Sequence, residues 1–276
     1  MLSLVVNTYN NADVIGDCIR SAQPYVEDVV VCDMHSTDDT VAIAQSLGAR
    51  IVYHPKAPSA EPARKTVIEA ASEAWVLVLD ADERLTPRLG EKLRELLATG
   101  QYDAINLWSR NWYYGGYMEH GGFYYQQMRC FRRTLFLATH DPSEDRAHSG
   151  FGRVTAKARA RLDLPKEYYY DHLAYPTIEK YVARTLAYYP LIESQYDHEQ
   201  GVRFSSRRMV LDPIKSFFRK YILEKGYRDG TRGLITCVLY AHYIFLKQAH
   251  LWYLETVPPS ERQQLPKPAN ATELAK

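Results

Sequence analysis

The segment Trp75-Val76-Leu77-Val78-Leu79-Asp80-Ala81-Asp82-Glu83 joins an unbroken apolar run to three carboxylates within four positions. An apolar run of this length predicts a strand over 75–79 that is buried on both faces, as in a parallel sheet. Asp80 and Asp82 are two positions apart, so at the end of an extended strand their side chains point to the same side. Carboxylate oxygens suit Mg²⁺ or Mn²⁺, which usually completes its shell with substrate phosphates and water. The alternative is an acidic pair that only caps the following helix.

The residues before this segment repeat one pattern, in which a short apolar run is followed by a polar turn and a segment of helical period. This alternation predicts βαβ units and an α/β fold with a mainly parallel sheet. The expected strands are 2–6, 28–32, 50–53 and 75–79, and the expected helices are 14–22, 41–47, 60–74 and 87–98.

The pattern changes twice after residue 100. Short strands and aromatic, glycine-containing turns are expected from 103 to about 164, and helices over roughly 178–198, 213–225 and 232–255. The residues after Pro258 are polar and proline-containing, and we expect them to be disordered.

Composition excludes several classes of protein. The chain has 276 residues, 46% of them hydrophobic and 24% charged, with a formal net charge of +1, so no overall field favours a nucleic-acid partner. Four cysteines without C-x-x-C spacing argue against a zinc cluster or a disulfide framework and suit a reducing compartment. The first expected strand follows Met1 without a signal-peptide pattern, so we expect a cytoplasmic protein.

The residues that follow the four expected strands form one candidate site, because ligands of open α/β sheets bind beyond the carboxyl ends of the strands. They are Asn7-Thr8-Tyr9-Asn10, Asp33-Met34-His35-Ser36, His54-Pro55 and Asp80-Ala81-Asp82-Glu83. Neither G-x-G-x-x-G after the first strand nor G-x-x-x-x-G-K-[ST] occurs, so a Rossmann dinucleotide site and a P-loop are not supported. A nucleotide would instead be bound by backbone groups of Asn7-Thr8-Tyr9-Asn10, with the aromatic ring of this stretch against the base.

Three of these motifs, Val5–Asn10, Val31–Thr40 and Leu79–Glu83, together resemble glycosyltransferase family 2 in order and spacing. The similarity continues through Met128–Arg133, His140-Asp141 and Asp212–Gly233, which resemble the bacterial subgroup of lipopolysaccharide-core glucosyltransferases. The resemblance implies a GT-A fold, a Rossmann-like α/β arrangement with a C-terminal helical extension. It divides the chain into a catalytic domain over 1–175, helices over 176–257 and a tail over 258–276. Within the catalytic domain, 1–100 would be the nucleotide-sugar half and 101–175 the acceptor half.

The resemblance also implies roles for the donor-site residues. Thr8, Tyr9 and Asn10 would hold the base, Asp33 the base or ribose, and Arg64 the base or diphosphate. Asp80-Ala81-Asp82 would hold the ribose, the metal and the diphosphate. The chain departs from the family pattern at Asn7, where proline is common, at Asn11, where an acidic residue is common, and over 61–66, a loose version of the usual arginine segment.

Enzymes of this family transfer the sugar with inversion, while a carboxylate takes the acceptor proton and Mn²⁺ or Mg²⁺ stabilises the leaving diphosphate. The His-Glu pair of similar proteins corresponds to His140-Asp141, so Asp141 is the candidate base and Glu144 the second. His172 matches a histidine that recurs in the subgroup and would reach the metal or diphosphate. The alternative for His172 is a structural role.

The expected reaction moves a sugar from a nucleotide-diphosphate donor to a cell-envelope glycan, glycolipid or other acceptor. A UDP-sugar is favoured, and GDP and dTDP remain open. The sequence argues against two other classes of protein. A sugar nucleotidyltransferase should carry a G-x-G-T-R loop after the first strand, which is missing, and a non-catalytic nucleotide-sugar or glycan-binding protein should have a broken D-x-D, which is intact.

Basic residues gather near apolar ones in the predicted C-terminal helices. Arg203, Arg207, Arg208, Lys215, Arg219 and Lys220 flank Phe217-Phe218 and Tyr221. This pattern suits an anionic membrane surface or a charged lipid acceptor, which would place the protein on the inner face of the cell membrane. The alternative is a solvated face packed on the catalytic domain. The apolar run Leu234–Leu246 is too short to span a bilayer, and is expected to be a core helix or an interfacial segment.

Overall fold

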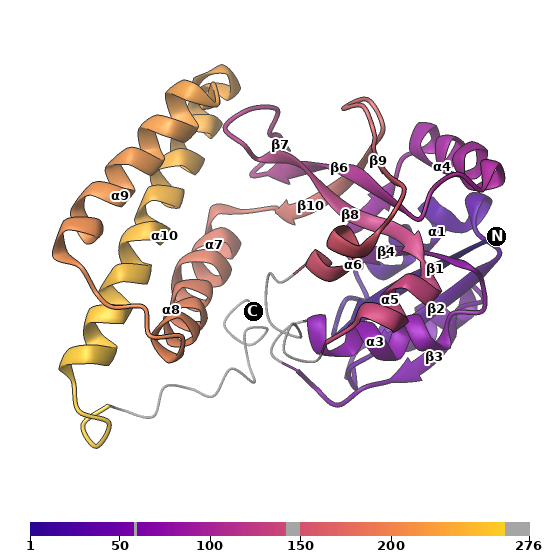
Figure 1. The fold of residues 1–276 in the computed structure, drawn as a ribbon, viewed down its shortest axis with the longest axis horizontal. Helices are drawn as coiled ribbons and strands as arrows, with labels where there is room; N and C mark the ends of the chain where they lie inside the picture. The colour runs from indigo at the N-terminus through magenta and orange to yellow at the C-terminus, as the bar shows by residue number, and fades with distance from the viewer. Residues whose placement is uncertain (58–59, 142–149, 263–276) are drawn as a thin grey trace. The chain divides into compact units, whose positions relative to one another are not determined.

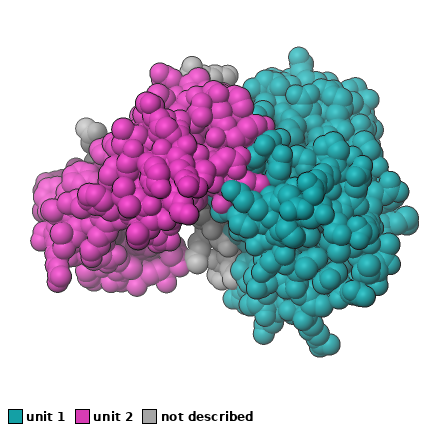
Figure 2. All heavy atoms as spheres, turned by 90° about the horizontal axis from the view of Figure 1, so that it is seen from above, with its two compact units in different colours: residues 1–110, 125–173 teal, residues 111–124, 174–276 magenta. Residues whose placement is uncertain are grey.

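The computed structural model describes residues 1–57, 60–141 and 150–262. The chain forms two compact units, the first made of 1–110 and 125–173 and the second of 111–124 and 174–276 (Figure 2). The predicted tail lies outside the described residues from position 263 onward.

Unit 1 is built on four parallel strands. They are β1 (Leu2–Thr8), β2 (Asp28–Asp33), β3 (Arg50–Tyr53) and β4 (Trp75–Asp80), in the order β3-β2-β1-β4. All four predicted strands are confirmed, and the fully buried residues 75–79 account for the unbroken apolar run. The predicted α/β class with a mainly parallel core is therefore confirmed.

The sheet continues beyond β4 with strands that follow it in sequence. β8 (Tyr124–Arg132) runs antiparallel to β4, and the order continues β8-β6-β10-β5. These strands are β6 (Ala104–Tyr113), β10 (Tyr169–Tyr175) and β5 (Glu83–Leu85), while β7 (Gly116–Tyr117) and β9 (Arg161–Asp163) pair with β6. The chain passes between the two units within β6, at the start of β8 and within β10.

Helices cover both faces of the central strands (Figure 1). α1 (Ile15–Ala22), α2 (Thr40–Ser46) and α4 (Pro87–Thr99) pack on one face, and α3 (Glu61–Ala70), α5 (Arg133–Thr139) and α6 (Gly152–Lys157) on the other. Strand residues alternate between the two cores, so Leu77 and Leu79 belong to the first and Val76 and Val78 to the second. Each fully buried side chain of this size contributes about 1.5–3 kcal/mol relative to exposure.

One helix is shorter than its pattern predicts. The segment expected to be helical to residue 74 ends as α3 at Ala70, and the backbone is already extended at Ala71. The next two amides donate elsewhere, Ser72 N–H to Asp28 Oδ2 at 2.9 Å and Glu73 N–H to Ser3 Oγ at 3.1 Å. These bonds to the sheet replace the last helical turn.

Unit 2 is mainly helical. It contains α7 (Ile178–Tyr181), η3 (Val182–Tyr188), α8 (Tyr189–Glu199), α9 (Ser206–Phe218), η4 (Arg219–Leu223), η5 (Gly226–Asp229) and α10 (Gly230–Thr256). α10 packs against α8 and α9. The helix expected to start at Pro213 instead begins at Ser206, because the Ser205 hydroxyl accepts the Arg208 N–H and Pro213 is tolerated inside the helix. Within the described residues, none of the helices combines the length and apolar character needed to cross a bilayer.

Tyrosine side chains form much of the core of unit 2. Tyr113, Tyr175 and Tyr181 meet with ring centroids 4.7–6.0 Å apart, beside the buried Phe123 and Cys237. Edge-to-face contacts of this kind add about 0.5–1.5 kcal/mol each to the burial of the rings.

Candidate active site

The parallel ladders of unit 1 bring the ends of three strands to one edge. Thr8 is paired with Asp33 across β1 and β2, and Asn7 with Asp80 across β1 and β4. The stretch after β3 joins them, because the His54 N–H donates to the Asp33 carbonyl at 3.1 Å. The four stretches singled out from the sequence therefore start from one edge of the sheet.

Asn10 ties the loop after β1 to the loop after β2. Its N–H donates to Ser36 Oγ at 2.9 Å, and its Oδ1 accepts the Thr37 N–H at 2.8 Å. The Ser36 hydroxyl and N–H donate in turn to Asp33, at 2.5 and 2.9 Å. Asn10 has a φ of 51°, a left-handed conformation that asparagine tolerates better than most residues. The predicted site residues Asn10 and Asp33 thus belong to one hydrogen-bonded loop pair.

Aromatic rings lie beside these loops. The Lys56 ammonium is 4.1 Å from the centroid of the Tyr9 ring, and His35 stacks on Tyr53 with centroids 5.6 Å apart. The Tyr53 side chain is exposed. Flat, partly exposed faces of this kind can stack on a planar ligand. Lys56 and Tyr53 were not singled out from the sequence, where neither belongs to a recognisable motif.

The end of β4 is held by a buried arginine of β8. Arg129 Nη2 donates to Asp80 Oδ2 at 3.0 Å and to Glu83 Oε1 at 2.7 Å. The Asp80 N–H also donates to Glu83 Oε2 at 2.8 Å, which closes the turn. Burial raises the pKa of Asp80, but the charges of Arg129, Arg64 and His172 and the hydrogen bond from Arg129 together lower it more, so that the carboxyl stays ionised. The fully buried Glu83 has its pKa raised to about 7, chiefly by desolvation.

Asp82 faces a different partner from Asp80. His172 is paired with Glu83 between β10 and β5, and its Nε2 lies 3.6 Å from Asp82 Oδ1. The Leu173 N–H donates to the Asp82 carbonyl at 2.9 Å, which fixes the backbone there. Burial lowers the pKa of His172, and the Asp82, Glu83 and Asp80 carboxylates together raise it by more. The structure thus brings the predicted residues Asp82 and His172 together.

These side chains can accept a divalent cation only together with a ligand. Among residues 1–57, 60–141 and 150–262, no group of three or more His, Cys, Asp or Glu side chains could hold a metal ion. Mg²⁺ is usually held by one or two carboxylates together with substrate phosphates, not by a cage of protein groups. Asp82 and His172 fit that use, since Asp80 already accepts a hydrogen bond from Arg129.

Arg64 is a second buried arginine near the end of β4. It lies on α3 and is 8% exposed, with its guanidinium 4.8 Å from the centroid of the Phe151 ring. Nη2 is 3.4 Å from Glu61, but Nε and Nη1 have no hydrogen-bond partner in the described part of the chain. The Arg64 charge also lowers the pKa of Asp80. Buried donors without partners cost about 1–3 kcal/mol each, a cost that an anionic ligand would remove.

The candidate base lies on another segment. Asp141 follows α5, and its carboxylate is ion-paired with the Arg153 guanidinium of α6. The second candidate, Glu144, lies outside the described residues.

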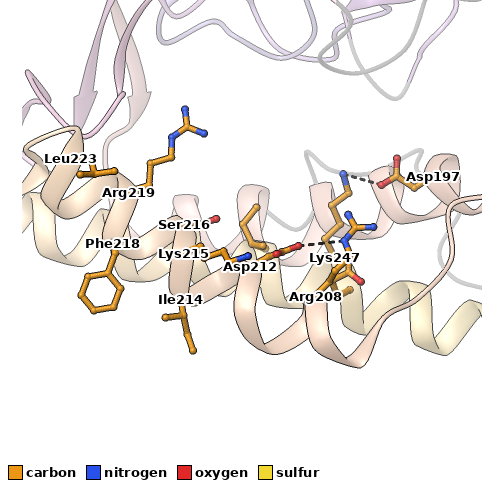
Figure 3. A pocket seen from close by; sticks show the side chains of 12 residues that line it. Asp197, Arg208, Asp212, Ile214, Lys215, Ser216, Phe218, Arg219, Leu223 and Lys247 are labelled. Carbon is orange, nitrogen blue, oxygen red and sulfur yellow. Dashed lines mark hydrogen bonds and ion pairs between the residues drawn. The ribbon is translucent and has the colours of Figure 1, made fainter.

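A pocket of about 700 Å³ lies in unit 2, away from these residues in sequence. Figure 3 shows its lining, which comes mainly from α9 and α10 and includes Arg208, Lys215, Arg219 and Lys247. None of the residues predicted for the donor site lines it. Strand-end geometry, not this pocket, therefore defines the candidate active site.

Comparison with known proteins agrees with this geometry. The model of the family described as glycosyl transferase family 2 matches residues 3–154, more than half of the chain. The chain is 28% identical to the lipopolysaccharide core biosynthesis glycosyltransferase LpsC of Rhizobium meliloti, over 91% of this chain and 92% of that protein. It is 26% identical to an uncharacterized glycosyltransferase of Rickettsia felis, over 91% and 89%.

Solved structures share the fold. S. aureus TarS 1-349 in complex with UDP-GlcNAc has a TM-score of 0.56 at 16% identity, covering 94% of this chain and 77% of that one. The mannosyltransferase PcManGT of Pyrobaculum calidifontis, in complex with GDP-Man and Mn²⁺, has a TM-score of 0.54 at 15% identity, covering 91% and 87%. With its GT-A fold and its strand-end site, the chain belongs to glycosyltransferase family 2 and is a glycosyltransferase.

Proposed function

We propose that this glycosyltransferase moves a sugar from a nucleotide-diphosphate donor, a UDP-sugar in the first instance, to a cell-envelope glycan or glycolipid, with inversion and with a divalent metal. The observation that carries the proposal is Arg64, whose Nε and Nη1 are buried and find no partner among residues 1–57, 60–141 and 150–262, beside a strand end that carries Asp80 and Asp82. A diphosphate supplies the anionic oxygens that these donors lack.

The nucleotide is held by the loops after β1 and β2. Thr8, Tyr9 and Asn10 contact the base through backbone groups and the Tyr9 ring, and Asp33 accepts a hydrogen bond from the base or ribose. The ties from Asn10 to the loop after β2 support this role, because they hold both loops in place before the donor arrives. The solved relatives with UDP-GlcNAc and GDP-Man support a nucleotide sugar as the ligand of this fold.

Asp82 and His172 hold Mn²⁺ or Mg²⁺ together with the donor phosphates. When bound, the ion neutralises charge that develops on the leaving diphosphate. Asp80 has a different task, because its hydrogen bond from Arg129 fixes its carboxylate beside the ribose and diphosphate. Arg64 donates to the diphosphate from the α3 side.

Asp141 takes the proton from the acceptor hydroxyl. Its ion pair with Arg153 orients the carboxylate, and the acceptor competes with that guanidinium for one oxygen. The acceptor half of the catalytic domain would then comprise residues 101–175, and 1–100 would be the nucleotide-sugar half. An envelope acceptor is supported by the similarity to LpsC along nearly the whole chain.

The test has two stages. Calorimetric titration with UDP, GDP, ADP and dTDP, each with and without Mn²⁺, selects the nucleotide. The matching sugar donors are then incubated with a lipopolysaccharide-core acceptor, and NMR of the product gives the anomeric configuration. We expect one nucleotide to bind with metal and the product to be inverted. Retention of configuration would reject the single displacement, and binding of none of the four would reject the donor site.

Asp141→Asn separates the two halves of the proposal. This substitution keeps the size of the side chain but removes its basicity, so transfer should fall by at least about 100-fold while nucleotide binding is kept. Transfer by Asp141→Asn at the normal rate would show that another group is the base.

A further inference from the structure

We propose that an apolar stripe on α9 and η4 docks this protein on an anionic lipid bilayer. The α9 stripe consists of Val210, Ile214, Phe218 and Ile222, spaced four residues apart and therefore on one face of the helix. Their exposed fractions are 59%, 49%, 56% and 49%, so about half of each large apolar side chain meets water. Figure 3 shows Ile214 and Phe218 projecting from the same side of α9.

Such a stripe needs an explanation in a water-soluble unit. Exposed apolar residues are ordinary when scattered, but a contiguous row marks a surface that something covers. The neighbouring helix α10, which packs against α9, exposes a second row made of Leu234, Val238, Phe245 and Trp252. Unit 2 therefore leaves apolar residues in water on two adjacent helices.

The charge of the surrounding segment identifies the partner. Residues 203–228 carry eight lysines and arginines against two carboxylates, a local net charge of +6 in a chain whose total is +1. Arg207 is exposed and lies one turn before Val210. Lys215 and Arg219 are exposed and follow Ile214 and Phe218 in sequence, and Arg219 also pairs with Glu224 at 2.8 Å. Neither Arg207 nor Lys215 forms an ion pair with the residues that the structure describes.

An apolar row bordered by cations fits the interface of an anionic membrane. The apolar side chains enter the boundary between headgroups and acyl chains, and the guanidinium and ammonium groups remain at the lipid phosphates. A second copy of the chain fits less well, because it would bring two +6 segments together without counter-charges. The proposal concerns a surface of unit 2 alone and does not rest on the donor site.

The experiment is flotation of the full-length chain, without nucleotide, with vesicles of phosphatidylcholine alone or mixed with phosphatidylglycerol. We expect binding to the mixed vesicles, which falls steeply between 0.1 and 0.5 M NaCl, and little binding to phosphatidylcholine. The partition coefficient should drop roughly 30-fold in Lys215→Gln/Arg219→Gln, at about fivefold per cation. A similar drop of roughly 30-fold is expected in Ile214→Ser/Phe218→Ser, because both half-exposed side chains lose apolar area.

Matched controls come from other parts of the chain. Arg20→Gln/Arg88→Gln removes the same charge from two exposed positions of unit 1, and Ile178→Ser removes an exposed apolar side chain from α7. These variants should bind vesicles like the unchanged protein. Equal binding to neutral and anionic vesicles, or no binding to either, would overturn the proposal. So would a dimer in sedimentation that Ile214→Ser/Phe218→Ser dissociates, since the stripe would then be an interface between copies.

Discussion

Arg64 and Arg129 are both buried beside the end of β4, yet their guanidinium groups differ in their hydrogen-bond partners. Arg129 bonds two carboxylates of the protein and leaves one buried nitrogen, Nη1, without a partner, whereas Arg64 leaves two, Nε and Nη1, among the residues that the structure describes. We therefore expect Arg64→Met and Arg129→Met to have opposite effects. Arg129→Met should lower stability, and Arg64→Met should chiefly weaken nucleotide binding.

The magnitudes follow from the contacts. Arg129→Met leaves the fully buried Glu83 and the Asp80 carboxylate without their counter-charge, which should cost about 3–5 kcal/mol of unfolding free energy. Arg64→Met loses one 3.4 Å ion pair with Glu61 but also removes two unsatisfied donors, so the net change should stay within about 1 kcal/mol. Two charge-assisted bonds to a diphosphate are worth about 3 kcal/mol or more, so Arg64→Met should weaken UDP binding roughly 100-fold.

Urea unfolding followed by circular dichroism gives the stabilities, and calorimetry with UDP and Mn²⁺ gives the affinities. Lys65→Met is the matched control, because Lys65 is the half-exposed neighbour of Arg64 on α3 and should change neither quantity. If Arg64→Met lowers the free energy of unfolding as much as Arg129→Met does, Arg64 has a structural role and the proposed contact with the diphosphate is wrong. The proposed contact is also wrong if Arg64→Met binds UDP with unchanged affinity.

Three further expectations concern the packing and the charges that hold the units. Gly90→Ala should cost about 1–3 kcal/mol in urea unfolding, because a Cβ there would meet the Tyr25 ring at 2.4 Å. Gly233→Ala should expose unit 2 to limited proteolysis, since its Cβ would lie 1.9 Å from the Gly226 carbonyl oxygen and no rotamer can relieve a backbone clash. Burial raises the pKa of Asp28, but its hydrogen bonds lower it more, so the folded pKa is depressed. Its stabilisation is present above the unfolded pKa of about 3.9 and is lost as pH falls through the folded value; urea midpoints at pH 7 and pH 3 should therefore differ less in Asp28→Asn.

The central strands could be predicted because their signals are local. An apolar run such as 75–79 is typical of a strand buried on both faces, and parallel neighbours bring their carboxyl ends to one edge. The position of Asp80 and Asp82 directly after the fourth strand therefore placed them at this edge of the sheet from the sequence alone. Asp82 and His172 lie 90 positions apart in sequence, and the resemblance to family members was the only indication that they might act together.

Arg129 shows where local patterns fail. Arg129 lies in β8, and nothing in the sequence of this strand indicates that it runs antiparallel to β4. The hydrogen bonds from Arg129 to Asp80 and Glu83 therefore could not be predicted from sequence spacing. The predicted helix start at Pro213 was wrong because residues outside the local pattern decide where α9 begins. Proline favours a helix start, but the Ser205 cap eight positions earlier and packing on α10 outweigh that preference.

We propose that the residues at the ends of β1, β2 and β4 form a metal-dependent nucleotide site. Calorimetric titration of UDP in the presence and absence of Mn²⁺, on the unchanged protein, Asp82→Ala and Asp141→Asn, tests it most directly. We expect UDP to bind only with Mn²⁺, Asp82→Ala to abolish this binding, and Asp141→Asn to keep it. UDP binding that is equally strong without Mn²⁺, or that survives in Asp82→Ala, would contradict this proposal.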